Sequence, residues 1–232
     1  MKIESILKKV VMSVTGLLLV GFLVTHLAGN QFIYFGDKAF NGYAEFLESK
    51  PAVVYTAEIG LLATFIVHLS TAFKLTLENK AARPKTNTER KTAGESTLPS
   101  RTMLITGIIV FAFIVLHVWQ FKFGDKTSTK AGEGGLWWLV AVKTFQDPMY
   151  VAIYSVSMLA LGFHISHGIG SAFQSLGLFS QHRHTVQRIG YVIGWILALG
   201  FLALPIYAYA FKPTVTSMVV VPEIKADKVD RK

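Results

Sequence analysis

The chain has 232 residues and a formal net charge of +9; hydrophobic residues make up 52% of it and charged residues only 16%, where a soluble domain has about 25%. This composition argues against a soluble enzyme domain, and the basic excess indicates membrane topology rather than nucleic-acid binding, because no basic run alternates with aromatic residues. Cysteine is absent, which excludes thiolate iron–sulfur clusters, disulfides and covalent haem attachment through C-x-x-C-H.

Five segments of the chain are long, apolar and nearly free of charge. Four of them, residues 10–36, 102–121, 148–182 and 189–211, contain no Asp, Glu, Lys or Arg, and the other, residues 51–73, contains only Glu58. The hydrocarbon core of a bilayer is ~30 Å thick and is crossed by about 20 helical residues. We therefore predict a single all-α domain over residues 1–232, an integral membrane bundle of five transmembrane helices at about 8–31, 51–77, 101–122, 147–175 and 188–211.

The first apolar segment follows three lysines, as the core of a signal peptide would, but it runs past His26 without an A-x-A-like cleavage site. It is therefore predicted to remain as the first helix. Segments on the N-terminal side of the membrane carry more Lys and Arg than those on the other side, so the positive-inside rule puts the N-terminus in the cytoplasm. The polar stretches 78–100 and 182–188 then face the cytoplasm as well.

Each of the first four predicted helices carries a deep histidine. A lone histidine in a span is more often a hydrogen-bonded core residue than a ligand, but four of them, at matched depths, change that balance. Each lies 16–18 residues, or ~24–27 Å, from the charge at its helix entry. His26 and His117 thus share an outer level, and His68 and His164 share an inner level ~15–20 Å away. One haem iron takes imidazoles from two opposing helices, so the depths predict two bis-histidine haems.

His164 has a competitor in His167, which stands on the same helix face, and depth favours His164 only slightly. Gly168, four residues after His164, would let a porphyrin edge approach the backbone, although ordinary helix packing in membranes also uses small residues. The fifth helix lacks a deep histidine, and we interpret its Gly190-x-x-x-Gly194 pattern as a packing motif.

Glu58 is the one carboxylate within a predicted span. It lies eight residues after Lys50, ~12 Å from the outer face and near the level of the outer pair. A carboxyl at this depth is suited to proton exchange with a quinone bound beside the outer haem. The alternative is that Glu58 caps a histidine or a hydroxyl of a neighbouring helix.

Short motifs follow one another along nearly the whole chain: Met12-Ser13-Val14-Thr15-Gly16, His26-Leu27-Ala28-Gly29-Asn30, His68, His117, and the run from His164 through Ser166-His167-Gly168 to Gln174-Ser175-Leu176-Gly177. In this order the chain resembles the cytochrome b subunit of succinate:quinone oxidoreductases, in the five-helix dihaem type that includes quinol:fumarate reductases. The resemblance implies two haem b groups, with ligands paired first helix to third and second to fourth. It selects His164 over His167, because His164 has glycines at i+4 and i+13.

The resemblance also implies roles for polar residues near the inner haem. Ser13 matches a position near the haem propionates, and Lys74 lies where a basic partner for them would be useful, unless it is a lysine that snorkels to the interface. Some dihaem members carry a glutamate two residues before the fourth ligand, proposed for transmembrane proton movement. Gly162 stands at that position here, so no proton route is expected through it.

The function implied is a membrane anchor, in the bacterial inner (cytoplasmic) membrane, that passes electrons between an iron–sulfur subunit and a quinone, menaquinone or ubiquinone. Succinate chemistry falls to a flavoprotein and an iron–sulfur subunit docked at the cytoplasmic loops 74–101 and 182–188, because the chain has no G-x-G-x-x-G segment for a flavin. Two alternatives remain. One is a cytochrome b anchor of another membrane oxidoreductase, such as a hydrogenase or formate dehydrogenase, and the other is a haem-free transporter that uses the histidines as a relay.

Overall fold

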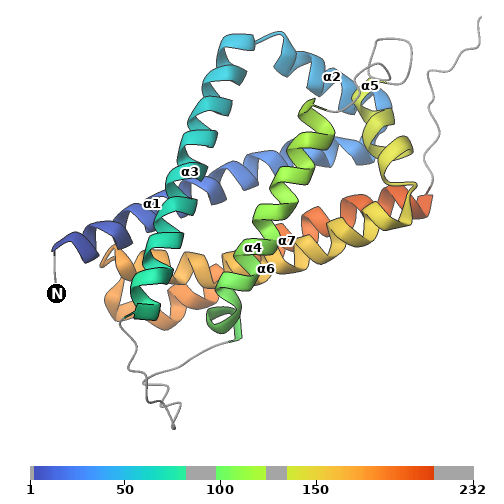
Figure 1. Ribbon diagram of the computed structural model, residues 1–232. Helices are drawn as coiled ribbons and strands as arrows, with labels where there is room; N and C mark the ends of the chain where they lie inside the picture. The colour runs from blue at the N-terminus through green and yellow to red at the C-terminus, as the bar shows by residue number, and fades with distance from the viewer. Residues whose placement is uncertain (1–2, 82–97, 124–134, 212–232) are drawn as a thin grey trace, which may run out of the picture.

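The computed structural model describes residues 3–81, 98–123 and 135–211, which are almost entirely helical and contain no strand. Five of the helices are long and apolar enough to cross a membrane. They are α1 (Ile3–Asn30), α3 (Pro51–Ala81), α4 (Leu98–Val118), α6 (Pro148–Ser175) and α7 (Arg183–Phe211). The predicted bundle of five spans is thus confirmed (Figure 1).

The observed helix boundaries follow local signals. Asp147 caps α6, because its carboxylate accepts a hydrogen bond of 2.8 Å from the backbone N–H of Met149 and Pro148 begins the helix. The span of α4 continues as a π-helical turn over Trp119–Phe123. α7 begins before its predicted start of 188, directly after the 3-10 turn Ser180–His182.

Two shorter helical segments lie at the end of the bundle opposite the N-terminus, in connections that the sequence predicts as loops (Figure 1). They are α2 (Asp37–Glu48) and α5 (Gly135–Trp137), the latter continued by a π-helical stretch over Trp138–Thr144. The two segments pack together, and the backbone N–H of Trp137 donates to the side-chain oxygen of Asn41 at 2.9 Å. Trp137 is only 2% exposed and belongs to the same hydrophobic core as the buried residues of α6 and α7.

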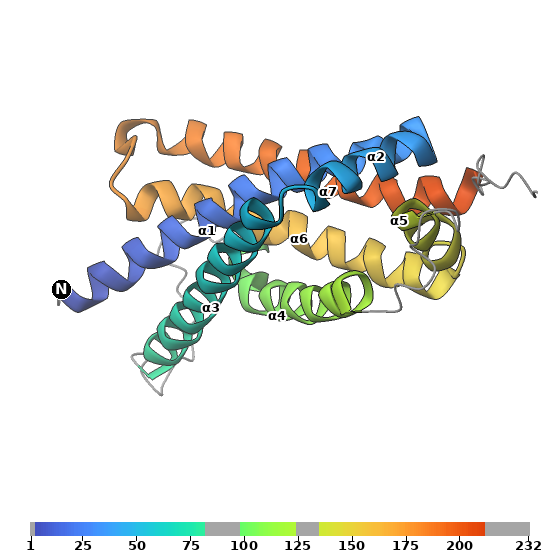
Figure 2. The same cartoon turned by 90° about the horizontal axis from the view of Figure 1, so that it is seen from above.

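The most extensive helix contact in the described part of the chain is the antiparallel pair of α6 and α7 (Figure 2). Small residues recur every fourth position on both helices, and opposite members face each other: Gly162 with Ala198, Ser166 with Gly194, and Gly170 with Gly190. A Cβ atom at Gly194 would lie 2.7 Å from the Ser166 nitrogen, closer than real Cβ contacts come. Membrane helices approach closely in this way because lipid provides no hydrophobic drive between them. The packing interpretation of Gly190 and Gly194 is confirmed.

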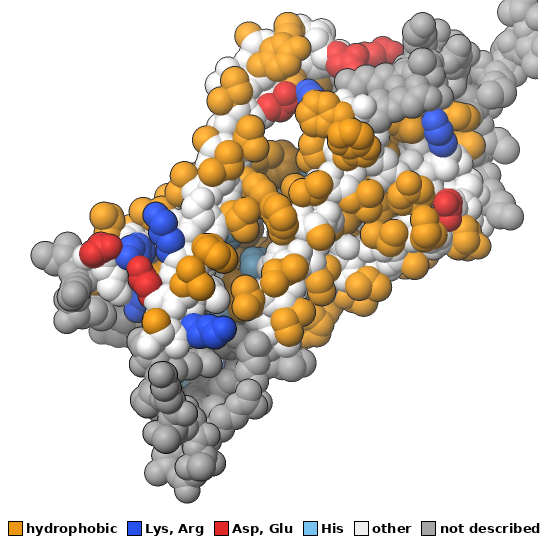
Figure 3. Space-filling view, in the orientation of Figure 1, with side chains coloured by type: hydrophobic (Ala, Val, Ile, Leu, Met, Phe, Trp, Pro, Cys, Tyr) orange, Lys and Arg blue, Asp and Glu red, His pale blue; other side chains and the backbone are white. Residues whose placement is uncertain are grey.

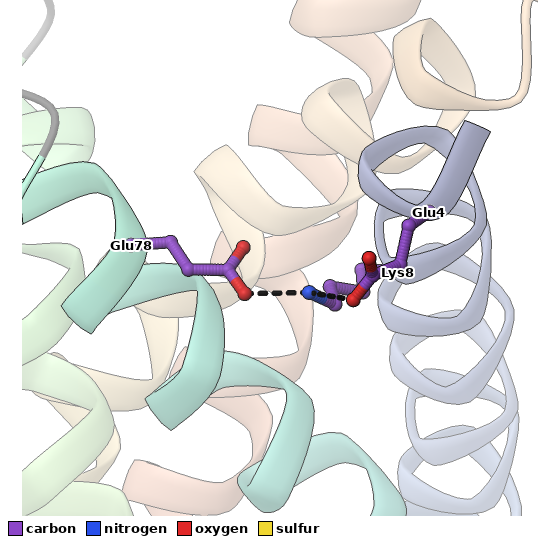
Figure 4. Close-up of polar contacts among 3 residues, drawn as sticks. All are labelled: Glu4, Lys8 and Glu78. Carbon is purple, nitrogen blue, oxygen red and sulfur yellow. Dashed lines mark hydrogen bonds and ion pairs between the residues drawn. The ribbon is translucent and has the colours of Figure 1, made fainter. Parts of the chain in front are cut away.

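Helix α3 is the most peripheral span, since none of its most apolar stretch is buried and Thr71 is its one buried residue. It packs mainly on α1, and a hollow separates it from α4, with histidine side chains visible at the bottom (Figure 3). Near the N-terminus the Lys8 ammonium of α1 contacts Glu4 at 2.8 Å and reaches Glu78 of α3 at 2.5 Å (Figure 4). This ion pair fastens one end of α3 to α1.

We predict that Gly194→Ala destabilises the bundle. The new methyl group would press on the backbone of α6, and overpacking of this kind costs about 1–3 kcal/mol. The free energy of unfolding, measured by SDS titration of the purified protein in mixed micelles, should fall by that amount. Gly60→Ala on α3 is the control, because nothing lies within 4 Å of its added Cβ. Equal stability of the two variants would contradict the prediction.

Candidate functional site

The structure brings His26 of α1 and His117 of α4 together. Their ring centroids are 5.9 Å apart and their planes nearly perpendicular, at 88°. Phe22 stacks on His26 at 5.2 Å, and Phe113 and Phe121 lie within 5.5 Å of His117. We call His26 and His117 the outer pair, meaning the pair farther from the end of the bundle that carries the N-terminus.

A chain of hydrogen bonds fixes the orientation of the His117 ring. The Tyr154 hydroxyl donates to the Gln120 side-chain oxygen at 2.9 Å, and the Gln120 amide nitrogen donates to the Thr144 hydroxyl at 3.2 Å. The Tyr154 proton is therefore committed, and its oxygen is left to accept from His117 Nδ1, 3.3 Å away. That arrangement places the ring proton on Nδ1 and the lone pair on Nε2.

His68 of α3 meets a threonine on α1 in the same way. Its Nδ1 lies 3.2 Å from the Thr15 hydroxyl, which donates to the Val11 carbonyl of its own helix at 2.7 Å. The hydroxyl oxygen can then only accept a proton from the ring, and the Met12 carbonyl is a second acceptor within its reach. Gly16 follows Thr15, and a Cβ there would lie 3.3 Å from His68 Cε1, so glycine lets the ring come close.

His164 of α6 repeats this arrangement with α4. Its Nδ1 lies 3.5 Å from the Thr106 hydroxyl, which is long for a hydrogen bond, and that hydroxyl donates to the Thr102 carbonyl at 3.0 Å. Gly107 then stands against the His164 ring. His68 and His164, the inner pair, each stand against a Thr-Gly segment of a neighbouring helix, α1 or α4. His167 is half-buried on the same helix, but it is His164 that meets Thr106.

The arrangement fits a haem iron held by two imidazoles. In three of the four rings Nδ1 faces a hydroxyl oxygen, which leaves Nε2 for a metal. A metal-bound ring nitrogen lies about 2 Å from the metal, so the centroids of two imidazoles on one iron are about 6 Å apart. The outer pair shows 5.9 Å. Within the described ranges no group of three or more His, Cys, Asp or Glu gathers to hold a bare metal ion.

Glu58 has a partner that the sequence does not indicate. Its carboxylate forms an ion pair of 2.5 Å with Lys122, at the end of the α4 span, and so bridges the hollow between α3 and α4. Lys122 also stands 5.9 Å above the ring of Tyr55. The side chains of Glu58 and Lys122 are 41% and 43% exposed. Glu58 is therefore bound to an ammonium rather than to the histidine or hydroxyl considered from the sequence.

Ser13 and Lys74 lie toward the N-terminal end of the bundle. Ser13 is buried and its hydroxyl donates to the Lys9 carbonyl at 2.8 Å, leaving the oxygen free to accept. Lys74 lies on α3, one turn beyond Thr71. Both residues are therefore nearer to the N-terminal end of the bundle than the inner pair.

Sequence reasoning assigns no role to Thr15, Thr106 or Tyr154, because hydroxyl residues are common in membrane helices. A shared spacing could have found both threonines, since each is followed by glycine and precedes a histidine at the same interval, Thr15 before His26 and Thr106 before His117. Nothing in the sequence separates Tyr154 from the other tyrosines.

Comparison with known proteins places the chain in a family. Residues 77–204 match the family described as "Succinate dehydrogenase/Fumarate reductase transmembrane subunit". The chain belongs to this family. It is also 28% identical, over 199 residues, to the "Succinate dehydrogenase cytochrome b558 subunit" of Bacillus subtilis (strain 168), a match that covers 83% of this chain and 90% of that protein. No solved structure matches the chain.

Membership of the family makes the chain a membrane cytochrome b subunit of the succinate dehydrogenase/fumarate reductase type, which contains haem b. It is a subunit of an enzyme complex of the succinate dehydrogenase/fumarate reductase family. The family serves as the membrane anchor of respiratory complex II, which implies flavoprotein and iron–sulfur partners.

Gly162, where some dihaem members carry a glutamate, lies in the contact between α6 and α7. A Cβ at this position would lie 2.9 Å from the Cβ of Ala198 and 3.3 Å from the Trp195 ring. The observed packing leaves no space for a carboxylate side chain there, which accounts for the departure from the pattern.

We predict that Gly16→Ala lowers the haem content of the purified protein or shifts its α-band. The added methyl group would stand 3.3 Å from His68 Cε1 and force the ring to move. Gly21→Ala, on the same helix with nothing within 4 Å of its Cβ, should leave both unchanged. Pyridine haemochrome assay and reduced-minus-oxidised spectra measure the two effects. A Gly16→Ala protein with the haem content and spectrum of the unaltered protein would contradict the close approach.

Proposed function

We propose that the chain is the dihaem cytochrome b anchor of a succinate:quinone oxidoreductase or quinol:fumarate reductase, passing electrons between an iron–sulfur subunit and a membrane quinone. The observation that carries the proposal is that the rings of His26 on α1 and His117 on α4 stand 5.9 Å apart, while His68 and His164 each face a threonine hydroxyl of a neighbouring helix. His26 and His117 would hold the outer haem, and His68 and His164 the inner one. Haem b bound by two imidazoles supplies a one-electron carrier.

The protein's own contribution would be to orient the ligands and exclude water. Thr15, Thr106 and Tyr154 accept the Nδ1 protons of three rings, so that Nε2 of each is left for the iron. Phe22, Phe113 and other apolar side chains surround the outer pair. A low-polarity environment of this kind tunes the redox potential of a bound cofactor. Ser13 and Lys74 are proposed as partners of the inner haem's propionates.

The orientation proposed is an N-terminus in the cytoplasm and a location in the bacterial inner membrane. It is supported by the excess of Lys and Arg in the segments on the N-terminal side of the spans. The flavoprotein and iron–sulfur subunits would dock on this face, against the loops 74–101 and 182–188. Residues 82–97 of the first loop lie outside the described part of the chain. Arg183 and Arg188 lie in the first turns of α7, because that helix begins at Arg183 and includes most of the second predicted loop.

A quinone, menaquinone or ubiquinone, is proposed to react beside the outer haem with Glu58 exchanging its protons. The Glu58 carboxylate lies on α3 at the edge of the hollow, and its side chain is 41% exposed. Its ion pair with Lys122 holds it in place while leaving one oxygen for a further partner.

Dithionite-reduced minus oxidised spectra of the purified complex should show a b-type α-band, with two haems per chain. Substituting His26 or His117 by Ala should remove one haem, and substituting His68 or His164 should remove the other, because each iron loses an axial ligand. His167→Ala is the matched control and should keep both haems. One haem per chain, or loss of a haem in His167→Ala with both retained in His164→Ala, would overturn the assignment.

Glu58→Gln should slow quinone-linked turnover severalfold and alter its pH dependence, while both haems remain reducible by succinate. Lys122→Met breaks the same ion pair but keeps the carboxylate, so it should slow turnover less. Succinate:quinone reductase activity across a pH series measures both variants. If both variants lost turnover equally, the ion pair would be what turnover requires, and proton exchange by Glu58 would be contradicted.

A further inference from the structure

One short pattern occurs on two helices. Met12-x-x-Thr15-Gly16 lies on α1 and Met103-x-x-Thr106-Gly107 on α4. In both helices a member of the outer pair, His26 or His117, follows the threonine at the same interval, i+11.

The i+11 interval places the threonine and the histidine on the same side of their helix. At about 3.6 residues per turn, an interval of i+11 makes three turns and about 20°, so the threonine and the histidine stand on one stripe of the helix, ~16 Å apart. Each of these two helices therefore presents a hydroxyl at the inner level and an imidazole at the outer level on the same side. The neighbouring helix in each case, α3 or α6, supplies the inner histidine that the hydroxyl meets.

The two contacts have the same donors and the same glycine neighbour, although the Nδ1–hydroxyl distance is 3.2 Å in one and 3.5 Å in the other. Each threonine donates its own proton to a carbonyl three or four residues earlier and can only accept from the imidazole. A Cβ on either Gly16 or Gly107 would lie 3.3 Å from Cε1 and 3.7 Å from Nδ1 of the facing histidine. An incidental contact between a threonine and a histidine would not reproduce the same glycine approach on an independent pair of helices.

We propose that α1–α3 and α4–α6 are two copies of one structural unit, in which Thr15 and Thr106 are positioning residues for His68 and His164. Both threonines then act on the inner haem, although the helices that carry them supply ligands to the outer one. The inference rests on the proposed function, since it concerns the same four histidines. When the threonine oxygen accepts a hydrogen bond from Nδ1, the imidazole becomes a more basic ligand. A more basic ligand favours the oxidised iron.

The test is a redox titration of the b haems in membranes containing the assembled complex. Thr15→Val and Thr106→Val keep the side-chain shape but remove the acceptor. This hydrogen bond is stronger when the iron is oxidised, so its loss should move the inner haem's reduction equilibrium about threefold to tenfold toward the reduced form. That change is about 30–60 mV upward at 59 mV per tenfold for one electron. The outer haem should not shift in either variant.

The controls separate positioning from structure. Thr15→Ser and Thr106→Ser keep the hydroxyl and should restore the original potential. Thr76→Val on α3 removes a hydroxyl that donates to the Ala72 carbonyl, a bond of the same type within a helix, and should shift neither haem. The inner component is the one absent from His68→Ala membranes, and the low-spin ferric EPR signals of the two haems give a second means of telling them apart.

The redox titration has outcomes that support the proposal and outcomes that overturn it. A shift of the inner component in both valine variants, or its selective loss with rescue by serine, supports the proposal. A shift of different components in the two variants, no shift in either, or loss of both haems that serine does not restore would overturn it. A protein that contained only one b haem would instead overturn the proposed function, so the two failures are distinguishable.

Discussion

The hydroxyl groups of Thr15, Thr106 and Tyr154 carry one proton each, and the histidine site depends on where that proton goes. In all three cases it is given to a carbonyl oxygen, either of the same helix or of the Gln120 side chain. Each oxygen can then only accept, so the facing imidazole must present N–H at Nδ1 and a lone pair at Nε2. In the hydrocarbon core no water competes for these groups. Three neutral hydroxyls thus set the tautomer of three rings without any buried charge.

The helices that hold these rings differ in how firmly they are supported. α6 lies against α7 at three successive close approaches, so the backbone that carries His164 has little freedom. α3 has one buried residue and would gain little from packing alone. Its His68 is held instead by the Thr15–Gly16 segment of α1, and the Lys8–Glu78 ion pair ties the same two helices together nearer the N-terminus. These contacts hold the peripheral helix α3 in place at the level of His68.

The five spans could be predicted because length and charge scarcity act over a whole membrane crossing of about 20 residues, a scale on which no tertiary contact is needed. The pairing of the histidines by depth follows from the constant helix rise, and the structure brings His26 and His117 together accordingly. The hydroxyl partners could not be predicted, because each depends on the rotation of one helix against another that lies far away in the sequence. The same holds for Lys122, which finds Glu58 on a different helix. The helix α2 escaped prediction because it is too short and too polar to resemble a span.

The contact of α6 with α7 also limits how this protein can change over generations. The facing pairs Gly162–Ala198, Ser166–Gly194 and Gly170–Gly190 keep one register along both helices, and His164 lies within that stretch. Inserting or deleting a single residue there would rotate everything beyond it by about 100°, separating the small residues and turning the imidazole away from Thr106. Apolar side chains on the lipid-facing sides can be exchanged for one another at little cost. Descendants of this chain are therefore free to vary in composition and in the length of the α6–α7 turn, but not in the residue count of the helices between these contacts.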